Sequence, residues 1–154
     1  MARLHPAAGL ILAALLLAGC SAPGAAPTPT PTGPPEVDVV SLAVGDCLDT
    51  HGRPGLAKAV PVVDCSLEHD SEAYARIVLD DGEFPGDAAV TTAAETGCVE
   101  AFSDFAGIDY ADSALDYAYY FPTAGSWAAG DRRILCLILD PAGRVAGSLE
   151  GAAR

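Results

Sequence analysis

The sequence predicts an α+β domain in which one main helix packs on a small, mostly antiparallel sheet, with two disulfide bonds. Residues 87–105 form the best segment with helical periodicity, whereas several shorter segments have the apolar patterns of strands. Most connections between these segments are short, which favours antiparallel pairing. Four cysteines follow Cys20, and this even number fits two disulfides in an oxidising compartment.

The helix is predicted over Asp87–Phe105. Its apolar residues recur at intervals of four and three, which places them on one face: Val90, Ala94, Cys98, Phe102 and Phe105. Asp87 is a suitable N-cap, and Gly107 a suitable end. Gly97 is expected to weaken the helix, because glycine has a poor helix propensity.

Strands are predicted at six places along the chain. They are Val39–Leu42, Ala59–Cys65, Ser71–Leu79, Tyr117–Phe121, Arg133–Leu139 and Val145–Leu149. Arg133–Leu139 is continuously apolar and is the expected central strand, and Val145–Leu149 is the expected final edge strand. In Ser71–Leu79, alternation places Ala73, Ala75 and Ile77 on one face and Tyr74 on the other.

The chain divides into an export signal at 1–19, a lipidated cysteine with a linker at 20–35, and a domain at 36–154. Arg3 precedes an apolar run from Ala7 to Leu17, and small residues follow it. As a helix this run would cover roughly 16 Å, whereas a bilayer core is about 30 Å thick. The run is therefore too short for a permanent membrane span.

Leu17-Ala18-Gly19-Cys20 resembles the lipobox of bacterial lipoproteins. The resemblance implies that a diacylglyceryl group is attached to the Cys20 thiol and that cleavage makes Cys20 the mature N-terminus. The membrane would then be a partner through this lipid anchor, on the extracytoplasmic face. The alternative is an ordinary secreted protein with a cysteine near its cleavage point.

The linker from Ser21 to Pro35 contains six prolines among its 15 residues and no large apolar side chain. Such a composition cannot form a core, and it favours an extended polyproline-like spacer. At roughly 3.1 Å per residue, the spacer would reach about 45 Å. We expect it to hold the domain clear of the membrane.

The formal net charge of −13 limits the partners that the chain can bind. Nucleic acid and anionic lipid surfaces attract basic proteins, so neither is an expected partner. Solubility is the preferred explanation of the acidity, ahead of a cation-binding role.

The four domain cysteines are Cys47, Cys65, Cys98 and Cys136. A zinc site is the alternative, but such sites usually contain closely spaced cysteine pairs that this sequence lacks. Of the three possible pairings, we predict Cys47–Cys65, which brackets a short loop, and Cys98–Cys136, which ties the helix to the central strand.

Ser66, His69 and Asp70 are the residue types of a hydrolytic triad. They lie within five positions, however, whereas triad residues normally converge from separate elements. Two acidic groups, at 80–83 and at 109–116, do not match the spacing of a calcium loop. The sequence therefore predicts no enzyme, no catalytic residues, no metal and no cofactor.

Six of the ten aromatic residues lie between positions 110 and 127. On a strand, Tyr117, Tyr119 and Phe121 share one face, and Tyr120 points to the other. Packing within the core is the preferred role of these rings. Tyr120 is the candidate for an exposed contact with a glycan or a protein.

From Val44 onward the pattern resembles the septum formation domain family of bacterial envelope proteins. The matching segments are Val44–Cys47, Val63–Ser66, His69-Asp70 with Glu72, Phe84–Gly86, the Cys98 helix, Pro122-Thr123, Ser126-Trp127, Gly130–Arg132 and Cys136. The resemblance implies a link to cell division and no known catalytic mechanism.

The expected function is that of a non-catalytic binding or scaffold domain of the cell envelope, with an envelope protein or a glycan as partner. Two alternatives stay open: a small envelope hydrolase that uses the region of Ser66, His69 and Asp70, and a lipoprotein that binds a solute or a cation.

Overall fold

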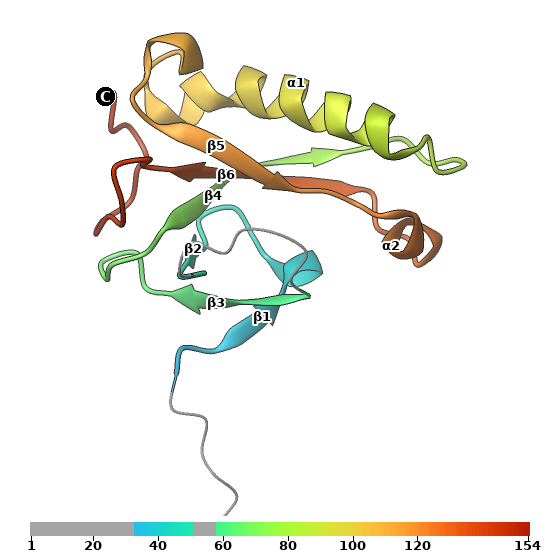
Figure 1. Ribbon diagram of the computed structural model, residues 1–154, viewed down its shortest axis with the longest axis horizontal. Coiled ribbons are helices and arrows are strands. Elements are labelled where there is room, and N and C mark those ends of the chain that lie inside the picture. Colours follow the sequence, from blue (N-terminus) through green and yellow to red (C-terminus); the bar gives the residue numbers. More distant parts are fainter. Residues whose placement is uncertain (1–32, 51–57) are drawn as a thin grey trace, which may run out of the picture. The chain divides into compact units, whose positions relative to one another are not determined.

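The computed structural model describes residues 33–50 and 58–154 of the 154-residue chain (Figure 1). The predicted export signal, the lipidation site at Cys20, nearly all of the linker and the loop that begins at His51 lie outside these residues. Within the described residues, no helix is both long and apolar enough to cross a bilayer.

Six antiparallel strands form one sheet in the order β1-β3-β2-β4-β6-β5. They are β1 (Glu36–Asp38), β2 (Cys47–Leu48), β3 (Ala59–Val63), β4 (Ser71–Val78), β5 (Asp116–Tyr120) and β6 (Arg133–Leu139). The helices are α1 (Asp87–Ala106), the short α2 (Ala124–Ala128) and the 3-10 turns η1 (Val39–Ser41) and η2 (Tyr110–Asp112). This arrangement confirms the predicted α+β class, with one main helix on an antiparallel sheet.

The two faces of the sheet carry separate hydrophobic cores. On the first face, Phe102 of α1 packs with Ile134 and Ile138 of β6. On the second face, Leu135 and Leu137 of β6 pack with residues of β2, β3 and β4 and of the turn after η1. Figure 1 shows α1 along the layer of β4, β5 and β6, with β1, β2 and β3 on the other side. Because β6 supplies both cores and lies between β4 and β5, it is the buried interior strand that the sequence predicts.

The predicted apolar face of α1 is confirmed at Val90, Ala94, Cys98 and Phe102, all of which are buried. The last buried residue is Ala106, and Phe105 is only partly buried. The prediction for the N-cap was wrong by one residue: Gly86 is the N-cap, and Asp87 is the first helical residue. At this position its negative charge interacts favourably with the positive end of the helix dipole. Gly107 adopts a left-handed conformation with φ of 79° and ends the helix as predicted.

Both predicted disulfides are present. Cys47–Cys65 joins β2 to the turn after β3, with Cα atoms 5.3 Å apart. Cys98–Cys136 joins α1 to β6, with Cα atoms 5.5 Å apart.

Two predicted strands do not form as expected. The first strand is Glu36–Asp38, and the predicted segment Val39–Leu42 is mostly the η1 turn. The Asp38 carboxylate accepts a hydrogen bond from Val40 N at 3.0 Å and so caps the turn in place of further pairing. Val145–Leu149 forms only an isolated bridge from Val145 to His69, and it includes Gly147 with φ of 90°.

A β-bulge in β4 overturns the predicted faces of that strand. The register with β6 shifts between Ala73 and Ala75. As a result, Tyr74, Ala75 and Ile77 all pack against the core under α1, whereas Ala73 belongs to the second core. Simple alternation fails here because a bulge inserts one extra residue into the pleat.

Candidate functional site

The polar segment after Cys65 does not form a triad. His69 is fully buried, and its Nδ1 lies 2.9 Å from the Leu67 carbonyl oxygen. Its backbone exchanges two hydrogen bonds with Val145, at 2.9 and 3.0 Å. Within the described residues, no hydrogen bond joins the Ser66 side chain to His69, and His69 Nε2 has no partner.

Asp70 contacts two hydroxyl groups among the described residues. Its carboxylate accepts hydrogen bonds from Thr50 Oγ1 at 2.9 Å and from Ser71 Oγ at 3.1 Å. Ser66 N donates to Asp64 at 2.8 Å. A hydrogen bond from the Ser66 side chain, and then this backbone bond, lower the pKa of Asp64. Within the described residues, Ser66 and His69 are therefore not joined by the hydrogen bond between nucleophile and base that a triad contains.

Glu72 is a buried carboxylate that the sequence analysis did not single out as a site residue. It is 3% exposed, and its two oxygens accept hydrogen bonds from Ser148 Oγ and Leu149 N, each at 2.7 Å. These bonds fasten the C-terminal segment to β4. Glu72 came up only as part of the family pattern, because its partners are 76 and 77 positions away.

Among the described residues, one group of three possible metal ligands has its atoms within 4.8 Å of one another: Cys47, Cys65 and Glu72. The two sulfurs form a disulfide, and both Glu72 oxygens accept hydrogen bonds. This donor set is thus committed to structural contacts. The acidic groups at 80–83 and 109–116 supply no such cluster within the described residues.

A groove of about 630 Å³ opens on the described surface. One wall consists of Asp38, Val39 and Val40, at the end of β1 and in η1, with Lys58 just before β3. The other wall consists of Tyr119, Tyr120 and Phe121 at the end of β5, followed by part of α2. The groove therefore lies between the two outermost strands of the sheet.

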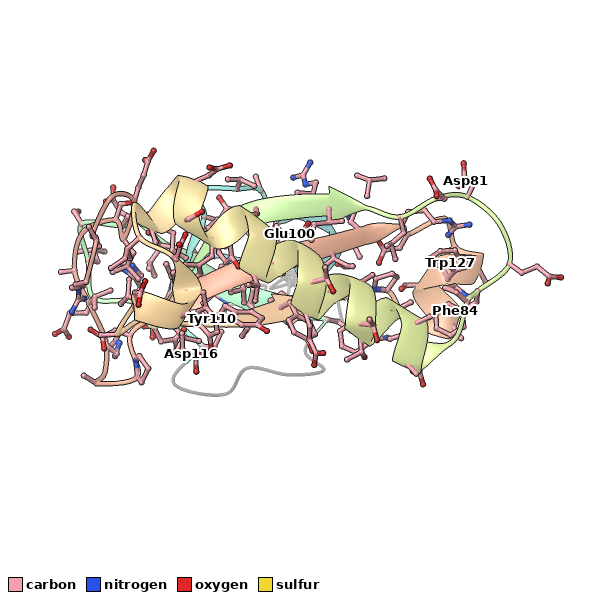
Figure 2. The ribbon with its side chains drawn as sticks, turned by 90° about the horizontal axis from the view of Figure 1, so that it is seen from above. Asp81, Phe84, Glu100, Tyr110, Asp116 and Trp127 are labelled. Carbon is pink, nitrogen blue, oxygen red and sulfur yellow. A yellow bond between two sulfur atoms is a disulfide. The ribbon has the colours of Figure 1, made fainter. Side chains whose placement is uncertain are left out.

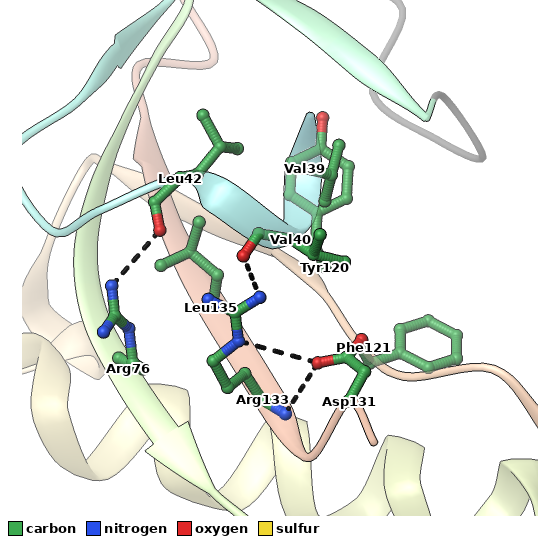
Figure 3. A pocket seen from close by; sticks show the side chains of 9 residues that line it. All are labelled: Val39, Val40, Leu42, Arg76, Tyr120, Phe121, Asp131, Arg133 and Leu135. Carbon is green, nitrogen blue, oxygen red and sulfur yellow. Dashed lines mark hydrogen bonds and ion pairs between the residues drawn. The ribbon is translucent and has the colours of Figure 1, made fainter. Parts of the chain in front are cut away.

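The η1 wall is fastened to the sheet by two arginines. Arg133 donates to the Val40 carbonyl oxygen and forms an ion pair with Asp131 at 3.6 Å. Arg76 Nη2 donates to the Leu42 carbonyl oxygen at 3.2 Å. Figure 3 shows these contacts around a smaller cavity of about 30 Å³ that shares lining residues with the groove. The groove wall is thereby held in place by β4 and β6.

The α2 wall is held by Trp127. The Arg132 guanidinium lies 3.9 Å from the centre of the indole ring, and Trp127 Nε1 donates to the Gly82 carbonyl oxygen at 2.9 Å. The Phe84 ring contacts the indole at a centroid distance of 5.7 Å. Arg132 also pairs with Asp81 at 3.2 Å. Figure 2 shows Asp81, Phe84 and Trp127 together at one end of the domain.

The aromatic residues of β5 point to the two faces as predicted. Tyr117, Tyr119 and Phe121 pack against the core under α1, and Tyr120 packs against the second core. Tyr120 is nevertheless half-buried, not an exposed ring, and its hydroxyl is buried without a hydrogen-bond partner in the described structure. Burial, and then the nearby charge of Asp70, raise the pKa of this hydroxyl. Tyr120 thus contributes to the groove wall from a packed position.

The sequence analysis missed Val39, Val40, Lys58 and the α2 residues as groove residues. Val39 and Val40 lie about 80 positions before the end of β5, and Lys58 lies about 60 positions before it, whereas α2 follows β5 directly. No local sequence pattern predicts that the β1–η1 segment lies near the end of β5, because the order of the strands brings them together.

The model of one protein family, described as septum formation, matches residues 41–152. No curated protein and no solved structure matches the chain at a significant level. The matched region spans the described domain from η1 to the C-terminal segment and contains all four bridged cysteines. The chain therefore belongs to the septum formation family.

Proposed function

We propose that this chain is a lipid-anchored protein on the extracytoplasmic face of the cell membrane, and that its domain serves septum formation by binding a partner and not by catalysis. The observation that carries the proposal is the groove between β1 and β5. Membership in the septum formation family supports the link to division. The lipobox pattern at Leu17–Cys20 supports the anchor.

The size and the lining of the groove are typical of a site that binds a ligand or a partner protein. Its volume falls within the range of about 300–1,000 Å³ that is usual for ligand sites. Two valines in the η1 wall and three aromatic residues in the β5 wall supply its apolar surface, and its charged lining residues are Asp38, Lys58 and Asp131. Such a combination of apolar walls and a few charges is typical of binding sites. The Glu72 carboxylate and the His69 backbone, in contrast, are engaged in fastening the C-terminal segment, and the His69 ring contacts the Leu67 carbonyl oxygen.

Filling the groove tests the binding role. Gly125 lines the groove within α2, and a Cβ atom there would meet only Thr123 Oγ1 within 4 Å, at 3.8 Å. A Gly125→Leu variant should therefore fold and occupy the groove. We expect it to fail to restore septum formation in cells that lack the protein, as measured by cell length and septum spacing.

Gly33→Leu is the matched control, because Gly33 also has open space around it and does not line the groove. Both variants should reach the membrane in normal amounts and retain the far-UV circular dichroism of the unaltered protein. Full complementation by Gly125→Leu would contradict the binding role.

The anchor has its own test. Cys20→Ala removes the thiol that would carry the lipid, so the variant should stay uncleaved by the lipoprotein pathway. We expect its intact mass to include the signal residues 1–19 and to lack the acyl chains. An unaltered protein whose Cys20 carries no lipid would refute the anchor.

A further inference from the structure

We propose that the groove binds an extended, basic segment of a partner protein, which adds as a strand to the outer edge of β5. The inference rests on the proposed binding role of the groove and specifies its ligand. It follows from the hydrogen-bonding directions of β5, from the position of the groove along that strand and from the charge of the chain.

The outer edge of β5 carries backbone groups that face away from the sheet. β5 pairs with β6 on one side only, and no other described strand pairs with it. Tyr117 N donates to its neighbour's side-chain oxygen, Asp116 Oδ1, at 2.8 Å, so this amide points away from β6. Alternate residues of a strand point their N–H and C=O groups in the same direction. The Tyr119 amide and carbonyl therefore point outward too.

The register of β6 supports the same assignment. Leu79 N donates to the Arg132 carbonyl oxygen at 2.8 Å, so the even-numbered residues at this end of β6 bond toward β4. The odd-numbered residues, such as Leu135 opposite Tyr120, are then the ones that bond toward β5. This leaves Tyr119 and Phe121 on the open edge.

The edge is blocked at one end and open at the other. At the start of β5, Asp116 accepts hydrogen bonds from the Tyr117 amide and from the Tyr110 hydroxyl, the latter at 2.9 Å. A side chain that occupies an edge amide is a common protection against unwanted strand pairing. Figure 2 shows Tyr110 and Asp116 at the end of the domain opposite Trp127. At the other end, no described residue bonds to the outward backbone groups of Tyr119 and Phe121, and the groove lies there.

The lining residues show that the groove follows the edge of β5. Tyr119 and Phe121 point to one face of the sheet and Tyr120 to the other, yet all three line the groove. Side chains from both faces can border one hollow only where the hollow runs past the edge of a strand. A peptide in this position could pair with the Tyr119 backbone and place alternate side chains against the two sets of rings, as in β-strand addition.

The charge of the chain selects the kind of peptide. Asp and Glu number 21 against 8 Lys and Arg, so an acidic segment would be repelled. At the groove itself, Lys58 and Asp38 are exposed, and Asp131, which pairs with Arg133, is partly buried in the lining. A basic segment is therefore attracted by the domain as a whole and by Asp38, whereas Lys58 opposes it locally.

The probe is a displayed library of random ten-residue linear peptides, selected on the full-length protein in detergent. We expect enrichment of peptides with alternating apolar residues and with Lys or Arg. Methylation of alternate backbone nitrogens in a selected peptide should lower its affinity at least tenfold, because the methyl groups block pairing with Tyr119. Lys58→Glu should tighten binding by about two- to fivefold, the usual effect of one exposed charge. Asp38→Asn, which keeps an oxygen to cap η1, should weaken it by a similar factor.

Gly125→Leu and Gly33→Leu separate this inference from the proposed function. Loss of peptide binding in Gly125→Leu, with retention in Gly33→Leu, supports it. Chitin oligosaccharides serve as the glycan probe. If these oligosaccharides bind the unaltered protein but not the Gly125→Leu variant, and no peptide is enriched, the groove is a glycan-binding site. The peptide inference is then overturned, whereas the proposed binding role stands. Equal affinity of methylated and unmethylated peptides also overturns it.

Discussion

Tyr120 shows how a residue can be placed on the correct face and still differ from its expected role. Alternation along β5 predicts its direction, which the second core confirms. Its exposure could not be predicted, because the residues that cover it come from β1 and η1. The ring is a packed wall of the groove, so its replacement by alanine would alter folding and contact together.

A conservative change separates these two effects. Tyr120→Phe removes a buried hydroxyl that has no hydrogen-bond partner among the described residues and keeps the packed ring. A buried polar group without a partner costs about 1–3 kcal/mol. We expect the free energy of unfolding to rise by about 1 kcal/mol, measured by urea denaturation. A loss of stability would show that the hydroxyl has a partner in the folded protein.

Glu72 and His69 are buried polar residues whose contacts are distant in the sequence. Both lie in or next to a polar segment that resembles a reactive site, yet both are buried and bonded to the C-terminal segment, His69 through its backbone and Glu72 through its carboxylate. Their partners, Val145, Ser148 and Leu149, could not be read from the sequence, since they lie more than 70 positions away. The prediction of an edge strand at Val145–Leu149 was wrong. Val145 forms an isolated bridge with His69, whereas Ser148 and Leu149 donate hydrogen bonds to the Glu72 carboxylate.

Among the elements, those with strong local patterns were predicted well. α1, β3, β4, β5 and β6 lie within a few residues of their predicted bounds. The strand predictions that were wrong have local causes, which a regular alternation of apolar and polar residues does not reveal. Asp38 caps a 3-10 turn where a strand was expected, and the bulge between Ala73 and Ala75 exchanges the faces of Ala73 and Tyr74 relative to the rest of β4.

Gly97 was expected to weaken α1, and the structure gives it a packing role. A Cβ atom at this position would lie 2.4 Å from Ile77 Cδ1 and 3.2 Å from Ile77 Cγ1. Gly97→Ala gains about 1 kcal/mol of helix propensity, but overpacking usually costs about 1–3 kcal/mol. We expect a net loss of about 1 kcal/mol in the free energy of unfolding, measured by thermal and urea denaturation.

The clash can be removed to check its cause. Ile77→Val deletes the Cδ1 atom, so Gly97→Ala should be less destabilising in that background. A double-mutant cycle would give the coupling between the two positions directly. If Gly97→Ala stabilises the otherwise unaltered protein, α1 does not need a glycine to approach β4.

For the whole molecule, the fold class was predictable and the groove was not. One amphipathic helix, several short strands and an even number of cysteines are local or compositional facts. The groove depends on strand order, which places β1 and β5 at the two edges of the sheet. It also depends on long-range contacts such as that of Arg133 with the Val40 carbonyl oxygen, 93 positions apart.

The two disulfides differ in how accessible their sulfur atoms are to a reductant. Cys98 and Cys136 are both fully buried between α1 and the sheet, whereas Cys65 is partly exposed in a turn. Thiol–disulfide exchange requires a thiolate to reach a sulfur atom. We therefore expect a mild reductant to open Cys47–Cys65 in the folded protein while Cys98–Cys136 stays intact.

Alkylation of free thiols after timed reduction, followed by peptide mass mapping, measures the order. The chain-entropy model assigns about 3 kcal/mol to the shorter loop and about 4 kcal/mol to the longer one. The singly reduced protein should thus keep α1 on the sheet and unfold at a lower urea concentration. Simultaneous opening of both bridges, or earlier opening of Cys98–Cys136, would mean that the core under α1 opens as readily as the turn at Cys65. In that case the domain would unfold as one unit before either bridge is reduced.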